Sequence, residues 1–241
     1  MISAVTIDFW QTLLVDPEHN LTNGRRHRLE GIGLSLARSG QRVTYQALER
    51  AYEESGRRLA QIWAGREDIS APAQVRLFLD CLEPGLSATL PEEILQTIEE
   101  VYTGPALHFP PVLAPGAAQA IRAISERGLP LAIVSNTGRT PGVILRKVLA
   151  SHGLLEQFTA LTFSDEARVR KPHPRIFQRT LAALGSDAAQ AVHVGDDPEA
   201  DVAGARAVGM QAIHLSADGQ PSAADATIQS LFELPEALAR L

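Results

Sequence analysis

Cysteine is almost absent from this chain of 241 residues, which contains only Cys81. One cysteine excludes an internal disulfide framework and a cysteine metal cluster, and it is typical of proteins from a reducing compartment. The N-terminal segment lacks the basic residues of a signal peptide, and its apolar run is too short for a signal peptide or a membrane span. We therefore expect a soluble cytoplasmic protein.

Basic residues are also fewer than acidic ones. The 22 lysines and arginines face 28 aspartates and glutamates, which gives a formal net charge of −6. This balance lacks the excess of basic charge that binding to nucleic acid or an anionic membrane requires. We expect a small-molecule partner, no nucleic acid or membrane partner, and a monomer or a homodimer. Only Lys147 and Lys171 are lysines, so Lys171, in the segment Arg170–Pro174, is a candidate functional group.

The hydrophobic pattern divides the chain into two kinds of region. Residues 3–8 form a predicted strand, and from Asn23 to about Tyr102 apolar residues recur at helical spacing. After Pro110 the pattern changes to helices and strands in alternation. The expected helices of this part cover residues 116–127, 141–151, 174–184 and 199–208, and the expected strands cover residues 129–135, 160–163, 191–195 and 211–215.

This alternation predicts an α/β fold with a Rossmann-like, doubly wound parallel sheet and helices on both faces. A lone strand before a helical segment has no partner of its own, so residues 3–8 belong to the same sheet. The helical block is then an insertion after the first strand. We expect a core of residues 1–16 and 111–241 and a helical cap of residues 17–110.

Polar residues lie at or shortly after several of these strands. In a parallel sheet they would meet at one edge, where open α/β sheets bind ligands. A carboxylate such as Asp8 can attack phosphorus or carbon and form a covalent intermediate that water hydrolyses. Ser135 and the amides beside it can hold phosphate oxygens, and Lys171 can neutralise negative charge. Asp8 and Asp196 together offer the oxygen ligands that suit Mg²⁺.

Four motifs in this order resemble the haloacid dehalogenase superfamily of hydrolases, in the subfamily with a C1 helical cap after the first strand. They are Asp8-Phe9-Trp10-Gln11-Thr12, Ser135-Asn136-Thr137, Lys171-Pro172 and the segment Gly195–Asp201. The resemblance covers essentially the whole chain. It implies a phosphatase-like hydrolase in which Asp8 is the nucleophile and Lys171 the catalytic cation.

The resemblance also implies the other site residues. The substrate would contact Thr12, Ser135 and Asn136. Mg²⁺ would contact the side chains of Asp8, Asp196 and Asp197 and the backbone carbonyl of Trp10. Asp197 has the alternative of touching only a metal-bound water, and Asp201 would orient Lys171 or water. Helix capping is an alternative for both, because the helix dipole favours acidic residues in a first turn.

Trp10 departs from the pattern of the superfamily's phosphatases, which have a second Asp at this position to protonate the leaving alcohol and activate water. Indole does neither near neutral pH. The family's dehalogenase branch has an aromatic residue here, which opens the alternative of a 2-haloacid dehalogenase. That branch has Ser and Asn in the segment where this chain has Gly195-Asp196-Asp197, and Tyr in place of Phe177. A third branch uses a cap lysine for carbon–phosphorus cleavage, and residues 17–110 contain none.

We therefore expect a Mg²⁺-dependent phosphate-monoester hydrolase that acts on a small phosphorylated metabolite through an aspartyl-phosphate. The alternatives are the dehalogenase and a non-catalytic protein that binds phosphate or metal. A cap-side residue can replace the missing acid, although short polar stretches after a first strand are usually solvated loop. Arg side chains of the cap can bind a substrate anion, and a solvated helix face explains them equally well. The candidates are Asp16, His19 and His27 for the acid, and Arg25, Arg26 and Arg28 for the anion.

Overall fold

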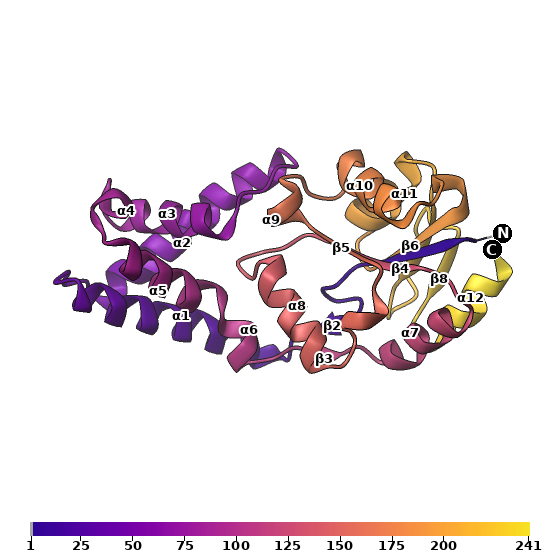
Figure 1. Cartoon of the computed structure of the whole chain (residues 1–241), viewed down its shortest axis with the longest axis horizontal. Coiled ribbons are helices and arrows are strands. Elements are labelled where there is room, and N and C mark those ends of the chain that lie inside the picture. Colours follow the sequence, from indigo (N-terminus) through magenta and orange to yellow (C-terminus); the bar gives the residue numbers. More distant parts are fainter. Residues whose placement is uncertain (1) are drawn as a thin grey trace.

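The computed structural model describes residues 2–241. Figure 1 shows an elongated molecule in which a group of helices lies at one end and a sheet flanked by helices lies at the other. Within residues 2–241, no helix is both long and apolar enough to cross a membrane.

The six-stranded sheet has the order β5-β4-β1-β6-β7-β8, and every neighbouring pair is parallel. Its strands are β1 (Ala4–Ile7), β4 (Leu131–Ser135), β5 (Ala160–Phe163), β6 (Ala191–Gly195), β7 (Gln211–Leu215) and β8 (Ala226–Ile228). All residues of β1, β4 and β6 are buried, as short apolar runs in a covered parallel sheet require. The predicted fold class is confirmed.

Helices cover both faces of the sheet (Figure 1). One face packs on α7 (Ala117–Glu126), α8 (Gly142–Ser151) and α12 (Leu234–Arg240) in a core that includes Ile121 and Leu145. The other packs on α10 (Pro174–Leu184) and α11 (Gly204–Ala207) in a second cluster. Short elements complete this part of the chain: η1 (Leu155–Gln157), α9 (Ser164–Ala167), η2 (Ala188–Gln190) and η4 (Leu231–Glu233).

The helices at the other end have an apolar cluster of their own. They are α1 (Glu18–Arg38), α2 (Tyr45–Ala64), α3 (Ala71–Leu82), α4 (Leu86–Thr89), α5 (Glu92–Thr103) and α6 (Pro105–His108). Thr44 and Ser70 directly precede α2 and α3, and the side chain of each accepts a hydrogen bond from a backbone N–H of the first turn as an N-cap. Where the chain enters and leaves this block, β2 (Leu14–Val15) pairs antiparallel with β3 (Val112–Leu113).

The predicted helix 199–208 differs from the observed segment. The chain forms a π-helical turn, η3 (Pro198–Ala203), before the short α11. The carbonyl of Asp197 accepts bonds from the N–H groups of both Asp201 and Val202, and this five-residue span widens the turn. The sequence analysis also did not predict β2, β3, β8 or α12, because two- and three-residue strands carry too little alternation to recognise.

Candidate active site

Asp8 and Lys171 meet at the carboxyl end of the central strands. Asp8 directly follows β1, and its N–H donates to the carbonyl of Val194 in β6. The Lys171 ammonium lies 2.6 Å from Asp8 Oδ1 and 2.5 Å from Asp201 Oδ1. All three side chains are buried. The sheet therefore brings together two carboxylates and one cation that the sequence predicted at separate motifs.

Asn136 fixes the backbone of Lys171. Its Oδ1 accepts from the Lys171 N–H at 2.7 Å, and its Nδ2 donates to the Lys171 carbonyl at 3.0 Å. The Lys171–Pro172 bond is cis. Both polar atoms of the Asn136 side chain are used in this pairing. In this arrangement Asn136 therefore positions Lys171.

His193 belongs to the same cluster, although the sequence analysis did not single it out. The His193 ring lies between Asp201 Oδ1, at 2.9 Å from Nε2, and Thr6 Oγ1, at 2.8 Å from Nδ1. Asp201 Oδ2 accepts from the N–H of Asp197 at 3.0 Å. The signal was present, since His193 is a polar residue inside the apolar run of β6. Such residues are usually hydrogen-bonded.

The two carboxylates beside Lys171 have opposite electrostatic environments. Burial raises the pKa of Asp8 above its ordinary value despite the lowering effect of Lys171, and the Asp201 charge raises it further. Burial alone would also raise the pKa of Asp201, but Lys171 and the bond with His193 hold it well below its usual range. Burial would lower the pKa of Lys171, whereas Asp201 and Asp8 raise it. Lys171 and Asp201 are therefore a charged pair.

Asp8, Asp196 and Asp201 form an acidic group in which one oxygen of each lies within 4.8 Å of the others. Asp201 is already bonded to Lys171, His193 and a backbone amide, whereas Asp8 has one side-chain partner within residues 2–241, Lys171 at its Oδ1. Thr12 Oγ1 donates to Asp196 Oδ1 at 3.1 Å. Burial, and then the Asp8 charge, raises the pKa of Asp196 to about 6. Asp8 and Asp196 therefore have the free oxygen capacity that a hard cation uses.

Three predicted site residues have other contacts in the structure. Asp197 caps η3, because its Oδ1 accepts from the N–H groups of Glu199 at 2.8 Å and Ala200 at 2.9 Å. The Ser135 hydroxyl is fully buried, 3.5 Å from the carbonyl of Asn136. Trp10 is half-buried, with its ring 4.9 Å from the Phe9 ring.

The residues predicted to replace the general acid or to bind a substrate anion differ in burial and contacts. His19 is exposed, and the centre of the His27 ring lies 4.4 Å from that of the tilted His108 ring. Asp16 is half-buried, accepts from Asn20 and lines a pocket of 90 Å³ together with Trp10. Of the three arginines, Arg25 pairs with Glu53 on the surface and Arg26 is exposed, whereas Arg28 is buried and lines the same pocket as Trp10.

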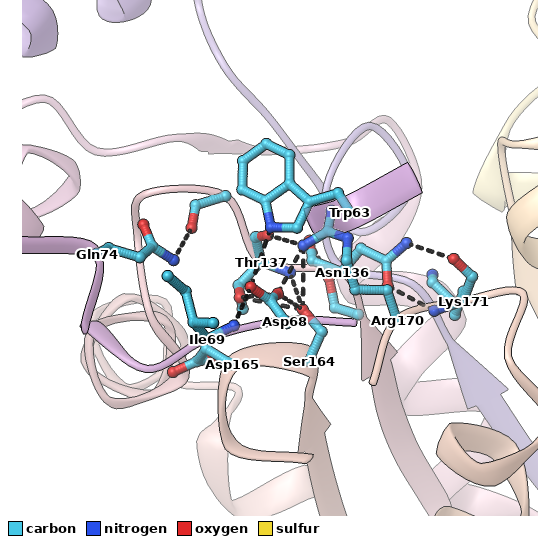
Figure 2. A network of polar contacts seen from close by, with 12 residues as sticks. Trp63, Asp68, Ile69, Gln74, Asn136, Thr137, Ser164, Asp165, Arg170 and Lys171 are labelled. Atoms are coloured by element: carbon cyan, nitrogen blue, oxygen red, sulfur yellow. Dashed lines mark hydrogen bonds and ion pairs between the residues drawn. The ribbon is translucent and has the colours of Figure 1, made fainter. Parts of the chain in front are cut away.

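Asp68 is the centre of a second polar network, between the helical block and the sheet edge (Figure 2). Its Oδ1 accepts from Trp63 Nε1 at 3.0 Å and from the Ile69 N–H at 2.8 Å. Its Oδ2 accepts from Ser164 Oγ and from Arg170 Nη1, both at 2.6 Å. Arg170 also donates to the Thr137 carbonyl and stacks on the Trp63 ring at 4.4 Å.

This network joins the helical block to the loops that carry Asn136 and Lys171. Glu67 forms an isolated antiparallel bridge with Val169, and Gln74 donates to the carbonyl of Gly138 at 3.1 Å. Figure 2 shows Asn136 bonded to Lys171 beside the network. The sequence analysis missed Asp68, because an Asp between two helices is indistinguishable from a surface residue without the fold.

Comparisons with known proteins agree with this geometry. The family model described as haloacid dehalogenase-like hydrolase matches residues 2–209. A phosphoserine phosphatase of Thermus thermophilus is 31% identical over 184 residues, which cover 76% of this chain and 68% of that protein. Several other curated relatives match over less than half of their own length.

Solved structures of both branches of the family resemble the whole chain. A 2-haloacid dehalogenase from Pseudomonas syringae has a TM-score of 0.73 at 26% identity, with 100% of this chain and 99% of that chain covered. A phosphatase from Thermococcus onnurineus, described as a HAD phosphatase, has a TM-score of 0.63 at 25% identity, with 98% of both chains covered. The resemblance noted in the motifs is confirmed, and the chain belongs to the haloacid dehalogenase-like hydrolases.

Proposed function

We propose that this hydrolase is a Mg²⁺-dependent phosphatase that cleaves a small phosphate monoester through an aspartyl-phosphate at Asp8. The observation that carries the proposal is the buried Asp8–Lys171 ion pair with Asp196 beside it. A carboxylate, a cation and a second carboxylate with free oxygens are what phosphoryl transfer to an aspartate needs. The similarity to a phosphoserine phosphatase supports the same reaction class.

The proposed reaction has two displacements at phosphorus. Asp8 attacks the phosphorus atom, the bond to the ester oxygen breaks, and that oxygen leaves with the electron pair. Water then attacks the same phosphorus, the bond to Asp8 breaks, and inorganic phosphate leaves. Lys171 neutralises negative charge on Asp8 and on the phosphoryl oxygens. Asp201 and His193 hold the ammonium in place for this task.

The donor set of the site fits Mg²⁺. We infer that Asp8 and Asp196 hold the ion, with the Trp10 carbonyl as a further ligand, because their oxygens are hard donors and Asp8 has only Lys171 as a side-chain partner within residues 2–241. When bound, Mg²⁺ would neutralise phosphoryl charge and orient the substrate. Thr12 orients Asp196, and contacts of Thr12, Ser135 and Asn136 with the substrate remain predictions, as does a metal contact of Asp197.

We propose that residues 1–16 and 111–241 form the hydrolase core and residues 17–110 its cap. The separate apolar clusters of the two parts support this division. The paired strands β2 and β3 lie at the two crossings between them. The cap then supplies the residues around the leaving group, and the core supplies Asp8 and Lys171.

Trp10 removes the usual general acid, so the leaving group must depart without a proton from this position. A general acid typically contributes about 10² to 10⁴ in rate. We therefore expect aryl and acyl phosphates to be hydrolysed well and alkyl phosphates poorly. Measuring kcat/KM across phenyl phosphates of decreasing phenol pKa tests this; a rate independent of the leaving group would show that another residue, with Asp16 as the candidate, donates the proton.

Dehalogenation is the second candidate, favoured by Trp10 and by the similarity to a 2-haloacid dehalogenase structure. Asp196 argues against it, because a carboxylate in the site repels a haloacid substrate unless a cation neutralises it. Release of phosphate from p-nitrophenyl phosphate and of halide from 2-chloropropionate, each with Mg²⁺ and with chelator, decides between the two. Metal-dependent phosphate release supports the proposal, halide release contradicts it, and no release from folded protein leaves the binding-protein alternative.

A further inference from the structure

The loop after β4 links Lys171 to the helical block. It begins with Asn136, whose side chain pairs with both the backbone N–H and the carbonyl of Lys171. Two residues later, the Gly138 carbonyl accepts a hydrogen bond from Gln74 of α3 at 3.1 Å. The next residue, Arg139, extends into the helical block itself. The loop is therefore held at one end by its pairing with Lys171 and at the other end by the helices.

The Arg139 guanidinium bonds to α2 and α5. Its Nη2 donates to the Tyr52 carbonyl at 2.9 Å, and both terminal nitrogens lie 3.3 Å from the Ser55 hydroxyl. Its Nη1 also donates to the Tyr102 hydroxyl. The Arg139 Cζ lies 3.8 Å from the centre of the Tyr52 ring and 5.5 Å from the centre of the Tyr102 ring. At such distances an aromatic face attracts a cation, so two helices of the block bind this one side chain.

Helix α2 has a glycine at the place where the guanidinium lies. A Cβ atom at Gly56 would be 3.1 Å from Arg139 Nη2, which is tighter than most contacts of a side-chain carbon. Glycine is unfavourable inside a helix, where alanine is preferred. Residues 52, 55 and 56 share one face of α2, because side chains three and four positions apart lie together. That face therefore has both the hydrogen-bond acceptors and the space that Arg139 needs.

A displacement of this loop would reach the catalytic cation through a single residue. Asn136 and Lys171 are 35 positions apart and belong to different loops, so their pairing makes the position of one depend on the other. The Lys171 ammonium lies 2.6 Å from Asp8 Oδ1. Misplacing a reacting group by about 1 Å can lower a rate about 100-fold.

We propose that Arg139 is a positioning residue for Lys171, that it acts through Asn136, and that α2 and α5 supply its binding site. The catalytic cation is then aligned with Asp8 only while the helical block holds the loop after β4. This inference rests on the proposed function for the role of Lys171 in the reaction. The position of Lys171 itself is measurable without turnover.

The composition of the chain provides that measurement, because Lys147 and Lys171 are its only lysines. Protein labelled with ¹³C and ¹⁵N in lysine gives one set of side-chain NMR signals for each, and the variant Lys147→Arg retains those of Lys171. Lys147 is exposed, whereas Lys171 is buried and paired with two carboxylates. The Lys171 signals therefore report on the environment at Asp8, and the Lys147 signals are an internal reference.

Two variants release the loop in different ways. Arg139→Gln removes the guanidinium, and Gly56→Leu retains Arg139 but fills the space beside it with a good helix former. In both we expect the Lys171 signals to shift or broaden while the Lys147 signals stay unchanged. We also expect kcat for p-nitrophenyl phosphate to fall by about tenfold or more and KM to change by less than about threefold. A substitution that only destabilises the fold would not produce this split.

Arg146→Gln is the matched control. Arg146 belongs to α8, seven positions further along the chain, and pairs with Glu166 at the surface. We expect both the Lys171 signals and kcat to keep their wild-type values in this variant. Lys171 signals at their wild-type positions in folded Arg139→Gln or folded Gly56→Leu overturn the proposal, whatever happens to stability. If neither variant folds, Arg139→Lys, which keeps the charge without the planar fork, is judged by the same signals.

The outcomes separate this inference from the proposed function. Lys171 signals that move in the variants, in a protein that hydrolyses no phosphate ester, support the positioning role and contradict the phosphatase. Hydrolysis of p-nitrophenyl phosphate by a protein whose Lys171 signals do not move in the variants contradicts the positioning role and leaves the phosphatase intact.

Discussion

Asp8 and Asp68 are both buried carboxylates with a neighbouring cation, but their surroundings differ. Asp68 accepts hydrogen bonds on both oxygens, from a tryptophan, a backbone amide, a serine and Arg170. Asp8 has a single side-chain partner within residues 2–241, Lys171 at its Oδ1, and burial raises the pKa of Asp8. A saturated carboxylate stabilises structure, whereas an unsaturated one with a shifted pKa is available for chemistry.

The contrast is tested most strongly by removing the charge of Asp8. Asp8→Asn keeps the shape of the side chain and is expected to lower kcat for p-nitrophenyl phosphate by at least about 10³-fold, because an amide is a poor nucleophile. Stability should not fall, because burial disfavours the charge of Asp8 and because Lys171 keeps Asp201 as its ion-pair partner. Steady-state kinetics and urea unfolding measure the two effects. Activity close to wild type would remove Asp8 from the mechanism.

The same substitution at Asp68 should act in the opposite sense. Asp68→Asn leaves Arg170 without its carboxylate partner, and breaking a buried pair typically costs about 3 to 5 kcal/mol of unfolding free energy. Urea unfolding measures this loss. Glu53→Gln is the control, because its pair with Arg25 is exposed and is expected to contribute less than about 1 kcal/mol. Equal effects at the two sites would contradict a structural role for the Asp68 network.

His193 gives a further test of this comparison, since its ring bonds to Asp201, which in turn pairs with Lys171. His193→Gln is expected to lower kcat about 10- to 100-fold, as loss of a residue that orients a catalytic group does, with KM little changed. Full activity in the variant would show that Asp201 holds Lys171 unaided. The matched control is His152→Gln, whose ring contacts the Pro111 carbonyl away from this cluster.

The smallest of the expected effects is the pH dependence of Mg²⁺ binding, measured as a change in Tm. The pKa of Asp196 in the metal-free protein is about 6, above its value in the unfolded chain. As pH rises, Asp196 therefore loses its proton first in the unfolded chain. Ionisation of Asp196 then lowers the free energy of unfolding between about pH 4 and pH 6, and this contribution stays constant above that range. Mg²⁺ competes with the proton, so it should raise Tm by about 3 °C or more at pH 7.5 and by much less at pH 5.

Thermal unfolding with Mg²⁺ and with chelator at both pH values checks this expectation. The control Asp196→Asn should show little effect of Mg²⁺ at either pH. An equal rise in Tm at pH 5 and pH 7.5 in the wild-type protein would contradict a metal site that includes Asp196.

The sequence predicted best the site residues that lie at the ends of the strands. The alternation of strands and helices predicted the parallel sheet, and parallel strands bring Asp8, Lys171 and Asp196 to one edge wherever the intervening segments fold. The family resemblance implied that Asp201 would orient Lys171 or water. The π-helical turn that aims it was not predicted, because it depends on bonds to one carbonyl, that of Asp197.

The residues that the sequence did not reveal connect the helical block to the part of the chain that forms the sheet. Asp68 and Arg170 are 102 positions apart, and their pairing depends on how two separately packed units dock. Arg25 and Arg28 are neighbours on one helix and look alike in sequence, yet one is at the surface and the other lines a pocket. Periodicity predicts the faces of a helix, but it does not predict what each face meets.

The most direct test of the account is whether phosphate passes through Asp8. Protein mixed with p-nitrophenyl phosphate and Mg²⁺ is quenched in acid within a single turnover and digested with pepsin, and the fragments are weighed by mass spectrometry. The account predicts one added phosphoryl group on the fragment that contains Asp8, which is absent in Asp8→Asn. Release of phosphate with no modified Asp8 at any time during the turnover would contradict it.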